Sequence, residues 1–325
     1  MNCRKHAGRA LLILGAIGAC AAPVAAQTYP DKPIRLLIGF GAGAAPDIVG
    51  RWVAQKLSER WQRQVIVDNR VGATGSIAAG LAARAAPDGY TLFMASAAMV
   101  VAPFFISDVP YDSFKDFAPV IQMVELPTVL VVWPQVAATN VRELIALAKA
   151  KPGQLNYATA GQGTTNHIGA EALRLRAGID ITEVGYKTAG DALNGTVRGE
   201  VALYFPSLPA ALPFIKQGRV RALGLASPRR SAAIPDLPTI AETLPGFGAS
   251  SFYGILVPVK TPAPIITKLH DEITRLLADP EMREKMLSVG AEVVTGPPAV
   301  LTERMRAEMK QVQAVVNGIR ARGGK

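Results

Sequence analysis

The sequence predicts an α/β protein built from two domains, and three observations support this. Short apolar runs typical of strands alternate with helical patterns along most of the 325 residues, which favours sheets with mainly parallel strands. Removal of an N-terminal leader leaves about 300 residues, enough for two hydrophobic cores. Two loops of small residues each join a strand to a helix, one in each half of the chain.

The first 26 residues have the pattern of a secretory leader. Basic residues come first, and the apolar run Ala10–Ala22 is too short to span a bilayer. Val24–Ala26 supplies small residues before a cleavage site at Gln27. Ile17–Cys20 offers a second interpretation, a lipobox that would make Cys20 a lipidated N-terminus. Both interpretations predict export to the periplasm.

Composition limits the chemistry of the mature chain. Cys3 and Cys20 both lie in the leader, so we expect no disulfide, thiol nucleophile or thiolate metal ligand. The net charge of +10 falls to +7 without the three leader cations. These charges are spread along helices and aromatic residues are sparse, which favours attraction of small anions over nucleic-acid binding. Proline, glycine or charged residues interrupt every later apolar run, so no transmembrane helix is expected.

The first half of the mature chain is expected to alternate strands and helices before two extended segments lead into a second unit. The expected elements are strand Ile34–Ile38, helix Ile48–Arg60, strand Val65–Asp68, helix Ser76–Ala85, strand Thr91–Ala95, and the extended segments Phe117–Val120 and Val129–Trp133.

The second half repeats this alternation and ends in helices. Its expected elements are helix Val141–Lys149, strand Leu155–Ala158, helix Ile168–Leu175, strands Val184–Tyr186, Val201–Phe205, Arg221–Ala226 and Ser250–Val257, and helices Pro264–Leu277, Pro280–Val289 and Pro298–Val316.

The loop Gly39–Asp47, between the first strand and helix, contains three glycines and three alanines. Such a loop exposes backbone N–H groups at a helix N-terminus, where the peptide dipoles favour an anion. A tight turn without a ligand is the alternative. Thr159–His167 occupies the equivalent position in the second half. Because ligands of open α/β sheets lie outside the carboxyl ends of strands, the two loops would face each other across a cleft.

Other chemistries fit less well. Gly39–Gly41 followed by Ala44 is close to a dinucleotide fingerprint, but nicotinamide pools are intracellular and Pro46 occupies the first helical turn. No G-x-S-x-G motif is present, and His167 and His270 lie 103 residues apart without neighbours at ligand spacing. We therefore expect no catalytic residue, metal or cofactor.

Several polar residues of the loops also have structural interpretations. Asp47 at a helix start is expected to accept from backbone N–H groups and shape its loop. Ser76, Thr164 and Thr165 are candidate N-caps, although hydroxyl groups beside a cleft can also bind a ligand. For His167 a hydrogen bond to the backbone competes with a direct ligand contact.

A set of motifs spread over residues 29–325 carries a family resemblance. These motifs are Tyr29–Arg35, Asp68–Ala73, Pro87–Leu92, Gly185–Lys187, Lys216–Leu223, Leu237–Glu242 and Tyr253–Gly254. Together they resemble the Bug (TctC-like) extracytoplasmic solute receptors of the tripartite tricarboxylate transporter family.

The resemblance implies a periplasmic binding protein of type II, with two α/β domains that close on a small carboxylate about a hinge. It implies a signal peptide at 1–26, a first domain at 27–125 that returns at 250–325, and a second domain at 126–249. Backbone amides, hydroxyls and ordered water of the two loops would grip the ligand. Carried onto this chain, the ligand-binding residues are Phe40, Gly41, Ala42, Gly43, Ala44, Asp47, Ser96, Thr159, Ala160, Gly161, Gly163, Thr164, Thr165, His167, Phe205 and Pro206.

Two departures from the family pattern bear on the ligand. The usual first loop, P-F-x-P-G-G-x-x-D, retains Phe40, Gly43 and Asp47 but loses both prolines and one glycine. An aspartate that commonly follows the phenylalanine of the second domain is replaced by Pro206. Since an aspartate there would suit an amine or hydroxyl donor, its absence favours a plain or aromatic carboxylate.

The resemblance thus implies a monomeric receptor that presents a bound organic acid to membrane permease subunits. A sensory receptor that signals to a partner and an exported enzyme on the same fold are the alternatives. The enzyme would need a reactive dyad, and the sequence offers none.

Overall fold

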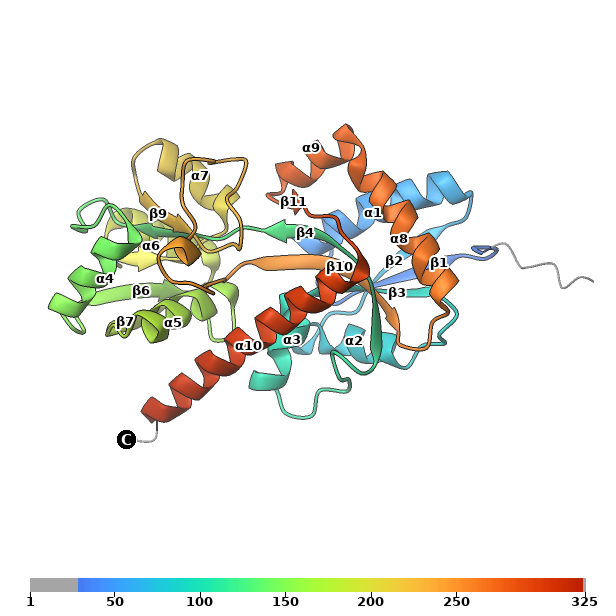
Figure 1. Ribbon diagram of the computed structural model, residues 1–325, viewed down its shortest axis with the longest axis horizontal. Helices are drawn as coiled ribbons and strands as arrows, with labels where there is room; N and C mark the ends of the chain where they lie inside the picture. Colours follow the sequence, from blue (N-terminus) through green and yellow to red (C-terminus); the bar gives the residue numbers. More distant parts are fainter. Residues whose placement is uncertain (1–28, 324–325) are drawn as a thin grey trace, which may run out of the picture.

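The structure is a computed structural model that describes residues 29–323. The expected leader at 1–26, including Cys20, and the cleavage site before Gln27 lie outside the described residues. The chain forms two lobes, each built on its own sheet, and α10 lies across both (Figure 1). The expectation of two α/β units is confirmed. No helix in the described range is both long and apolar enough to cross a membrane.

The first lobe is a six-stranded sheet with helices on both faces. Its strand order is β11-β4-β10-β3-β1-β2. The strands are β1 (Ile34–Ile38), β2 (Val65–Asn69), β3 (Thr91–Ser96), β4 (Phe117–Leu126), β10 (Ser251–Pro258) and β11 (Glu292–Val293). One face packs on α1 (Ala45–Trp61), α8 (Ala263–Ala278) and α9 (Pro280–Ser288). The other packs on α2 (Ser76–Ala83), α3 (Ala97–Phe105) and the start of α10 (Pro298–Gly323), and η1 (Ala73–Gly75) precedes α2.

The second lobe is a five-stranded sheet in the order β7-β6-β8-β5-β9. The strands are β5 (Val129–Val132), β6 (Leu155–Thr159), β7 (Ile181–Gly185), β8 (Leu203–Tyr204) and β9 (Arg221–Leu225). One face packs on α4 (Val141–Ala150), α5 (Thr165–Ala177) and the end of α10. The other packs on α6 (Ala189–Arg198) and α7 (Leu208–Lys216), and η2 (Ile240–Glu242) follows β9.

Alternation of side chains along β1 explains why this strand can be covered on both faces. Ile34, Leu36 and Ile38 point to the core under α1 and α8, whereas Leu37 points to the core under α2 and α3. Successive side chains of a strand lie on opposite faces, so a continuous apolar run is needed when both faces are buried. The run in β1 therefore predicts a two-sided sheet correctly.

The sheets are mixed, and the expectation of mainly parallel strands is wrong. Among the named strands, five of the nine pairings are antiparallel. Parallel neighbours need a long crossover, usually a helix. The chain instead leaves the first lobe along β4 and returns along β10, and these two strands pair antiparallel over their whole length.

Three helices were not predicted from the sequence, and each contains residues that disfavour a helix interior. α3 reads AAMVVAPFF, which has no polar face and contains Pro103. α6 contains Gly190 and Gly195, and α7 contains Pro209 and Pro213. Glycine and proline are typical of turns and helix boundaries, so these three segments were not recognised as helices.

Helix α10 packs into the cores of both lobes. Leu301 and Met305 on its first half belong to the core of the first lobe. Val312 and Val315 on its second half belong to that of the second. Together with the crossings before β5 and before β10, this helix is a third connection between the lobes (Figure 1).

Close packing between β10 and its neighbours leaves no room for a side chain at Gly254. A Cβ there would lie 2.7 Å from the carbonyl oxygen of Ile121 and 2.9 Å from Cδ1 of Leu301. We expect Gly254→Ala to destabilise the protein by about 1–3 kcal/mol, measured by urea unfolding. Gly185→Ala is the control, since a Cβ there meets nothing within 4 Å. Equal stability of the two variants would contradict this packing.

Candidate ligand-binding site

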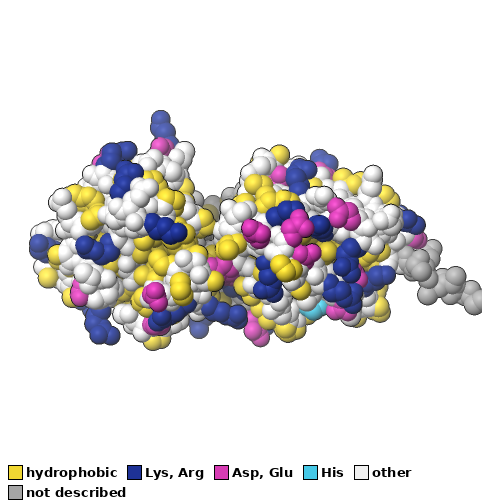
Figure 2. Space-filling model, turned by 90° about the horizontal axis from the view of Figure 1, so that it is seen from above, with side chains coloured by type: hydrophobic (Ala, Val, Ile, Leu, Met, Phe, Trp, Pro, Cys, Tyr) yellow, Lys and Arg dark blue, Asp and Glu magenta, His cyan; other side chains and the backbone are white. Residues whose placement is uncertain are grey.

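A cavity of about 490 Å³ lies between the two sheets, and both lobes and the crossings line it. The first lobe contributes Phe40, Thr74, Ser96, Ala97, Ala98, Val101, Ala102, Phe105 and Ile106. The second contributes Gln162, Gly163, Thr164, Thr165, Asn166, Ile168, Ala189, Tyr204, Phe205 and Ser207. Leu126, Thr128, Ser251, Tyr253 and Glu308 come from the crossings and the middle of α10. Figure 2 shows the hollow between the two lobes at the surface.

Several helices begin at this cavity. Ser96 is the N-cap of α3, and the first-turn residues Ala97 and Ala98 line the wall. Thr164 and Ser207 hold the same position for α5 and α7. No side chain caps the first turn of α3. In α7 the Leu208 N–H donates to the Pro127 carbonyl at 2.9 Å and Pro209 has no N–H, so this helix has fewer donors to offer. Three helix N-termini thus meet at the cavity, and the start of α3 in particular favours an anion.

The walls are otherwise apolar, and the charge among the lining residues is negative. None of the described residues that line the cavity is lysine, arginine or histidine, and Glu308 is the one ionisable carboxyl group among them. Phe40, Phe105 and Phe205 are large apolar members of the lining. An anion in this cavity would therefore be held by backbone N–H and hydroxyl groups rather than by a cation, with apolar contacts to its body.

Asp47 fixes the shape of the first loop. Its carboxylate is 1% exposed and accepts hydrogen bonds from the Gly43 N–H at 2.8 Å, Arg51 Nε at 2.9 Å and Asn69 Nδ2 at 2.8 Å. Burial acts to raise the pKa of Asp47, but the bonds from Arg51, Gly43 and Asn69 outweigh it and hold the pKa below its usual 3.8. Asp47 is therefore ionised at neutral pH and ties the loop to α1 and β2.

The backbone of the first loop also touches the segment before α2. A Cβ at Gly39 would lie 2.6 Å from Cα of Gly75, so this approach requires glycine. Thr74, one residue earlier, lines the cavity with a positive φ of 55°. The tip of the loop, Ala42 and Gly43, is exposed.

The second loop is held by its own polar side chains. Asn166 Oδ1 accepts from the Ala160 N–H at 3.0 Å, and the Thr164 hydroxyl donates to the Gly161 carbonyl at 2.6 Å. Thr164 is the N-cap of α5 and accepts from the His167 N–H, so that expectation is confirmed. Ser76 is not a cap, because Gly75 occupies the N-cap position of α2 and Ser76 is its first helical residue.

His167 lies behind the second loop. It is 2% exposed, and its Nδ1 accepts from the Gly163 N–H at 3.3 Å. Burial lowers the pKa of His167, which keeps the ring neutral and this nitrogen free to accept. A small separate cavity of about 110 Å³ adjoins it, lined also by Tyr157 and Glu171. This geometry agrees with the backbone-bonding interpretation of His167.

The structure brings six of the residues expected from the sequence into the cavity wall: Phe40, Ser96, Gly163, Thr164, Thr165 and Phe205. The others lie outside this lining, in the loops or behind them: Gly41, Ala42, Gly43, Ala44, Asp47, Thr159, Ala160, Gly161, His167 and Pro206. Pro206 is buried, and its carbonyl accepts from the Val129 N–H at 3.0 Å.

Sequence reasoning missed the start of α3 and the lining residues near the crossings. Tyr253 and Ser251 lie on β10, and Glu308 lies on α10. Both elements were expected as a strand and a helix, but no local motif marks these positions as cavity residues.

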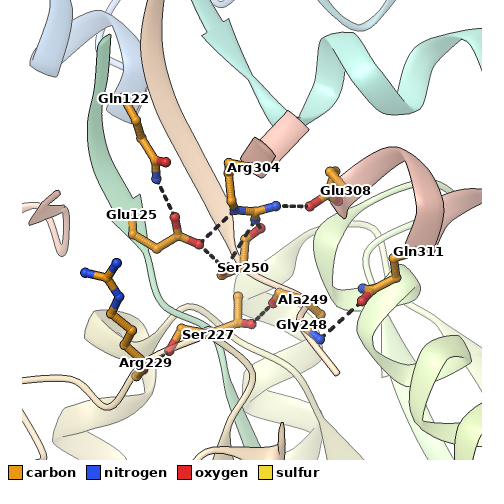
Figure 3. Close-up of polar contacts among 11 residues, drawn as sticks. Gln122, Glu125, Ser227, Arg229, Gly248, Ala249, Ser250, Arg304, Glu308 and Gln311 are labelled. Carbon is orange, nitrogen blue, oxygen red and sulfur yellow. Dashed lines mark hydrogen bonds and ion pairs between the residues drawn. The ribbon is translucent and has the colours of Figure 1, made fainter. Parts of the chain in front are cut away.

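A buried polar cluster joins the crossings to α10 (Figure 3). Arg304 Nε lies 3.3 Å from Glu125 Oε1, its Nη1 lies 2.8 Å from Glu308 Oε2, and its Nη2 donates to the Ser250 carbonyl at 2.6 Å. Gln122 Nε2 donates to Glu125 at 2.8 Å, and the Ser250 hydroxyl also donates to Glu125. Burial acts to lower the pKa of Arg304, but Glu125 and Glu308 outweigh it and raise the pKa.

Two α/β lobes joined by crossing segments around an anion-favouring cavity define a solute-binding receptor. Among residues 29–323 no group of three or more histidine, cysteine, aspartate or glutamate side chains is placed to hold a metal ion. The sequence profile described as "Tripartite tricarboxylate transporter family receptor" (TctC) matches residues 49–320. The chain therefore belongs to this family of receptors, to which the Bug proteins belong.

Two curated relatives support the same assignment. The chain is 35% identical over 292 residues to a UPF0065 protein in the tcbD-tcbE intergenic region of Pseudomonas sp. (strain P51), covering 89% of this chain and 87% of the relative. It is 34% identical over 296 residues to the protein BugT of Bordetella pertussis, covering 89% and 91% of the two chains.

Solved structures give the same result. A protein described as a periplasmic transporter is 33% identical with a TM-score of 0.69, over 89% of this chain and 97% of the other. R. palustris Rpa4515 with adipate is 30% identical with a TM-score of 0.69 over the same shares. MatC (Rpa3494) from Rhodopseudomonas palustris with bound malate is 29% identical with a TM-score of 0.67, over 89% of this chain and 100% of the other.

Removal of the negative charge from Asp47 should loosen the first loop. We expect Asp47→Asn to lose about 1–3 kcal/mol of stability at pH 7, since Arg51 loses its charged partner. Because the pKa of Asp47 is lower in the folded protein than the value near 3.8 of the unfolded chain, its carboxylate stabilises the fold at pH values above 3.8. This stabilisation is lost as the pH falls through the pKa of the folded protein. The difference in free energy of unfolding between wild type and variant should thus be largest at pH 7 and decrease below pH 3.8, as measured by urea unfolding at several pH values.

The matched control for this experiment is Asp236→Asn, because Asp236 is exposed and its replacement should change stability by less than about 0.5 kcal/mol. A pH-independent gap for Asp47→Asn would show that its charge does not hold the loop.

Proposed function

We propose that this receptor captures a small organic carboxylate in the cavity between its two lobes. The observation that carries the proposal is the convergence of helix N-termini, with that of α3 free of a side-chain cap, on a cavity whose described lining holds no cation. A carboxylate can bind there through backbone N–H groups, supported by the hydroxyls of Ser96 and Thr165.

The solved structures support the same ligand class. Adipate and malate are the molecules named with two of the similar structures, and both carry carboxylates at their ends. The cavity of about 490 Å³ is within the usual range for small-molecule sites.

Ligand binding would act by shifting the receptor between more open and more closed arrangements of its lobes. A ligand that contacts both lobes stabilises the closed form by its extra affinity for that form. We propose that the closed form is presented in the periplasm to the membrane permease of a tripartite tricarboxylate-type transporter. No covalent step enters this cycle, so the chain acts as a binding protein and not as an enzyme.

Thermal-shift measurements against mono-, di- and aromatic carboxylates test this function. A true ligand at 100 times its dissociation constant should add about 2.7 kcal/mol of stability. The proposal fails if neutral or cationic solutes raise the melting temperature while no carboxylate does.

A blocked cavity provides the matched variant. Ala98 lies in the first turn of α3 and lines the cavity. Ala98→Trp should therefore fill the site and weaken the apparent affinity for the ligand, derived from the thermal shift, at least tenfold. Ala150→Trp, at an exposed position of α4, should keep the wild-type affinity. Retained binding in Ala98→Trp would place the ligand elsewhere.

A further inference from the structure

Glu308 is an unusual member of the cavity wall. It is a carboxylate, 4% exposed, in a cavity whose helix ends favour anions. It comes from the middle of α10, where that helix passes between the lobes, and it lines the cavity together with Thr128 and Ser251 of the crossings.

Only part of the Glu308 carboxylate is used within the protein. Its Oε2 accepts from Arg304 Nη1 at 2.8 Å. Among the described residues its Oε1 has no hydrogen-bond partner, and the side chain contributes to the cavity lining. An acceptor oxygen is therefore available to a bound ligand at the α10 wall of the cavity.

The charge behind this wall is also unbalanced. Arg304 is shared between Glu308 and Glu125, so two buried carboxylates meet one guanidinium (Figure 3). Burial and, to a smaller extent, the charge of Glu125 raise the pKa of Glu292, a third carboxyl group of this region. Burial and the charge of Glu125 raise the pKa of Glu308, against the lowering effect of Arg304. Both directions indicate that negative charge is unfavourable beside this cluster, and a second anion placed at the cavity wall would meet the same penalty in a low-dielectric site.

We propose that Glu308 determines ligand specificity: it accepts a hydrogen bond from a donor group on the ligand and excludes a second carboxylate from the α10 wall of the cavity. This inference rests on the proposed carboxylate-binding function. The ligand class is then a monocarboxylate with an apolar body and a hydroxyl or ammonium group at its other end. It differs from a dicarboxylate such as adipate, which is named with one of the similar structures.

The proposal also supplies an acceptor that the sequence had not provided. Pro206 stands where the family pattern commonly has an aspartate, and its carbonyl is bonded to Val129. Glu308 offers a carboxylate to the same cavity from a different element. A donor-bearing ligand is therefore compatible with this cavity in spite of the proline.

The test uses ligands that differ only at their far end. Calorimetric titration of the full chain would compare hexanoate, 6-hydroxyhexanoate, 6-aminohexanoate and adipate, with the four- to eight-carbon versions of each to allow for cavity length. We expect the hydroxy and amino compounds to bind wild type at least tenfold more tightly than the dicarboxylate of equal length. The order of these affinities in wild type tests the proposal even if a variant fails to fold.

Glu308→Gln keeps the side-chain shape and removes the charge. It should reduce the preference for the amino compound over the dicarboxylate at least tenfold, a change that loss of a merely structural brace would not produce. Glu125→Gln is the matched control, because it removes a charge from the same guanidinium but Glu125 does not line the cavity. It should change the preference less than threefold.

The outcomes separate the two proposals. If no carboxylate of any length binds wild type, the proposed function fails and this inference fails with it. If adipate or another dicarboxylate binds as tightly as its amino counterpart, or if Glu308→Gln leaves the preference unchanged, the role of Glu308 is wrong while carboxylate binding stands.

Discussion

The contact on which the two-lobed arrangement depends is the sharing of Arg304 between Glu125, Glu308 and the Ser250 carbonyl. Glu125 lies where the chain leaves the first lobe, and Ser250 lies where it returns. A buried guanidinium must satisfy its donors locally, because an unpaired buried charge is strongly unfavourable. Arg304 therefore fixes both crossings against α10, and the cavity wall that contains Glu308 is a direct result of this fixation.

Two kinds of polar group line the cavity in this arrangement. Helix ends and hydroxyls, which carry no net charge, face the cavity at the starts of α3, α5 and α7. The one ionisable carboxyl group of the described lining, Glu308, comes from α10. Orientation of a ligand then follows from these polar groups, and the apolar side chains of the lining accept carbon chains or rings without strong direction.

Much of the fold was predictable from the sequence because its signals are local. The apolar run of β1 and the following small-residue loop identified a strand-to-helix junction, and α5 began three residues earlier than expected because Thr164 caps it. α3 was not found, since all its residues are apolar and it therefore has no amphipathic pattern. The antiparallel pairing of β4 with β10 depends on where the lobes meet, which no window of sequence contains.

The candidate site divides in the same way. Phe40, Thr164 and Thr165 were found because they belong to loops with a recognisable composition. Tyr253 and Glu308 reach the cavity from segments more than 80 residues away along the chain, and only the tertiary arrangement brings them there.

Helix α10 has a consequence for how the molecule is assembled. Leu301 and Met305 complete one core, and Val312 and Val315 complete the other. Neither core is whole without this helix, so the packing of both lobes depends on it. A substitution that loosens α10 would therefore be felt in both lobes at once, although most of each lobe is formed by other segments.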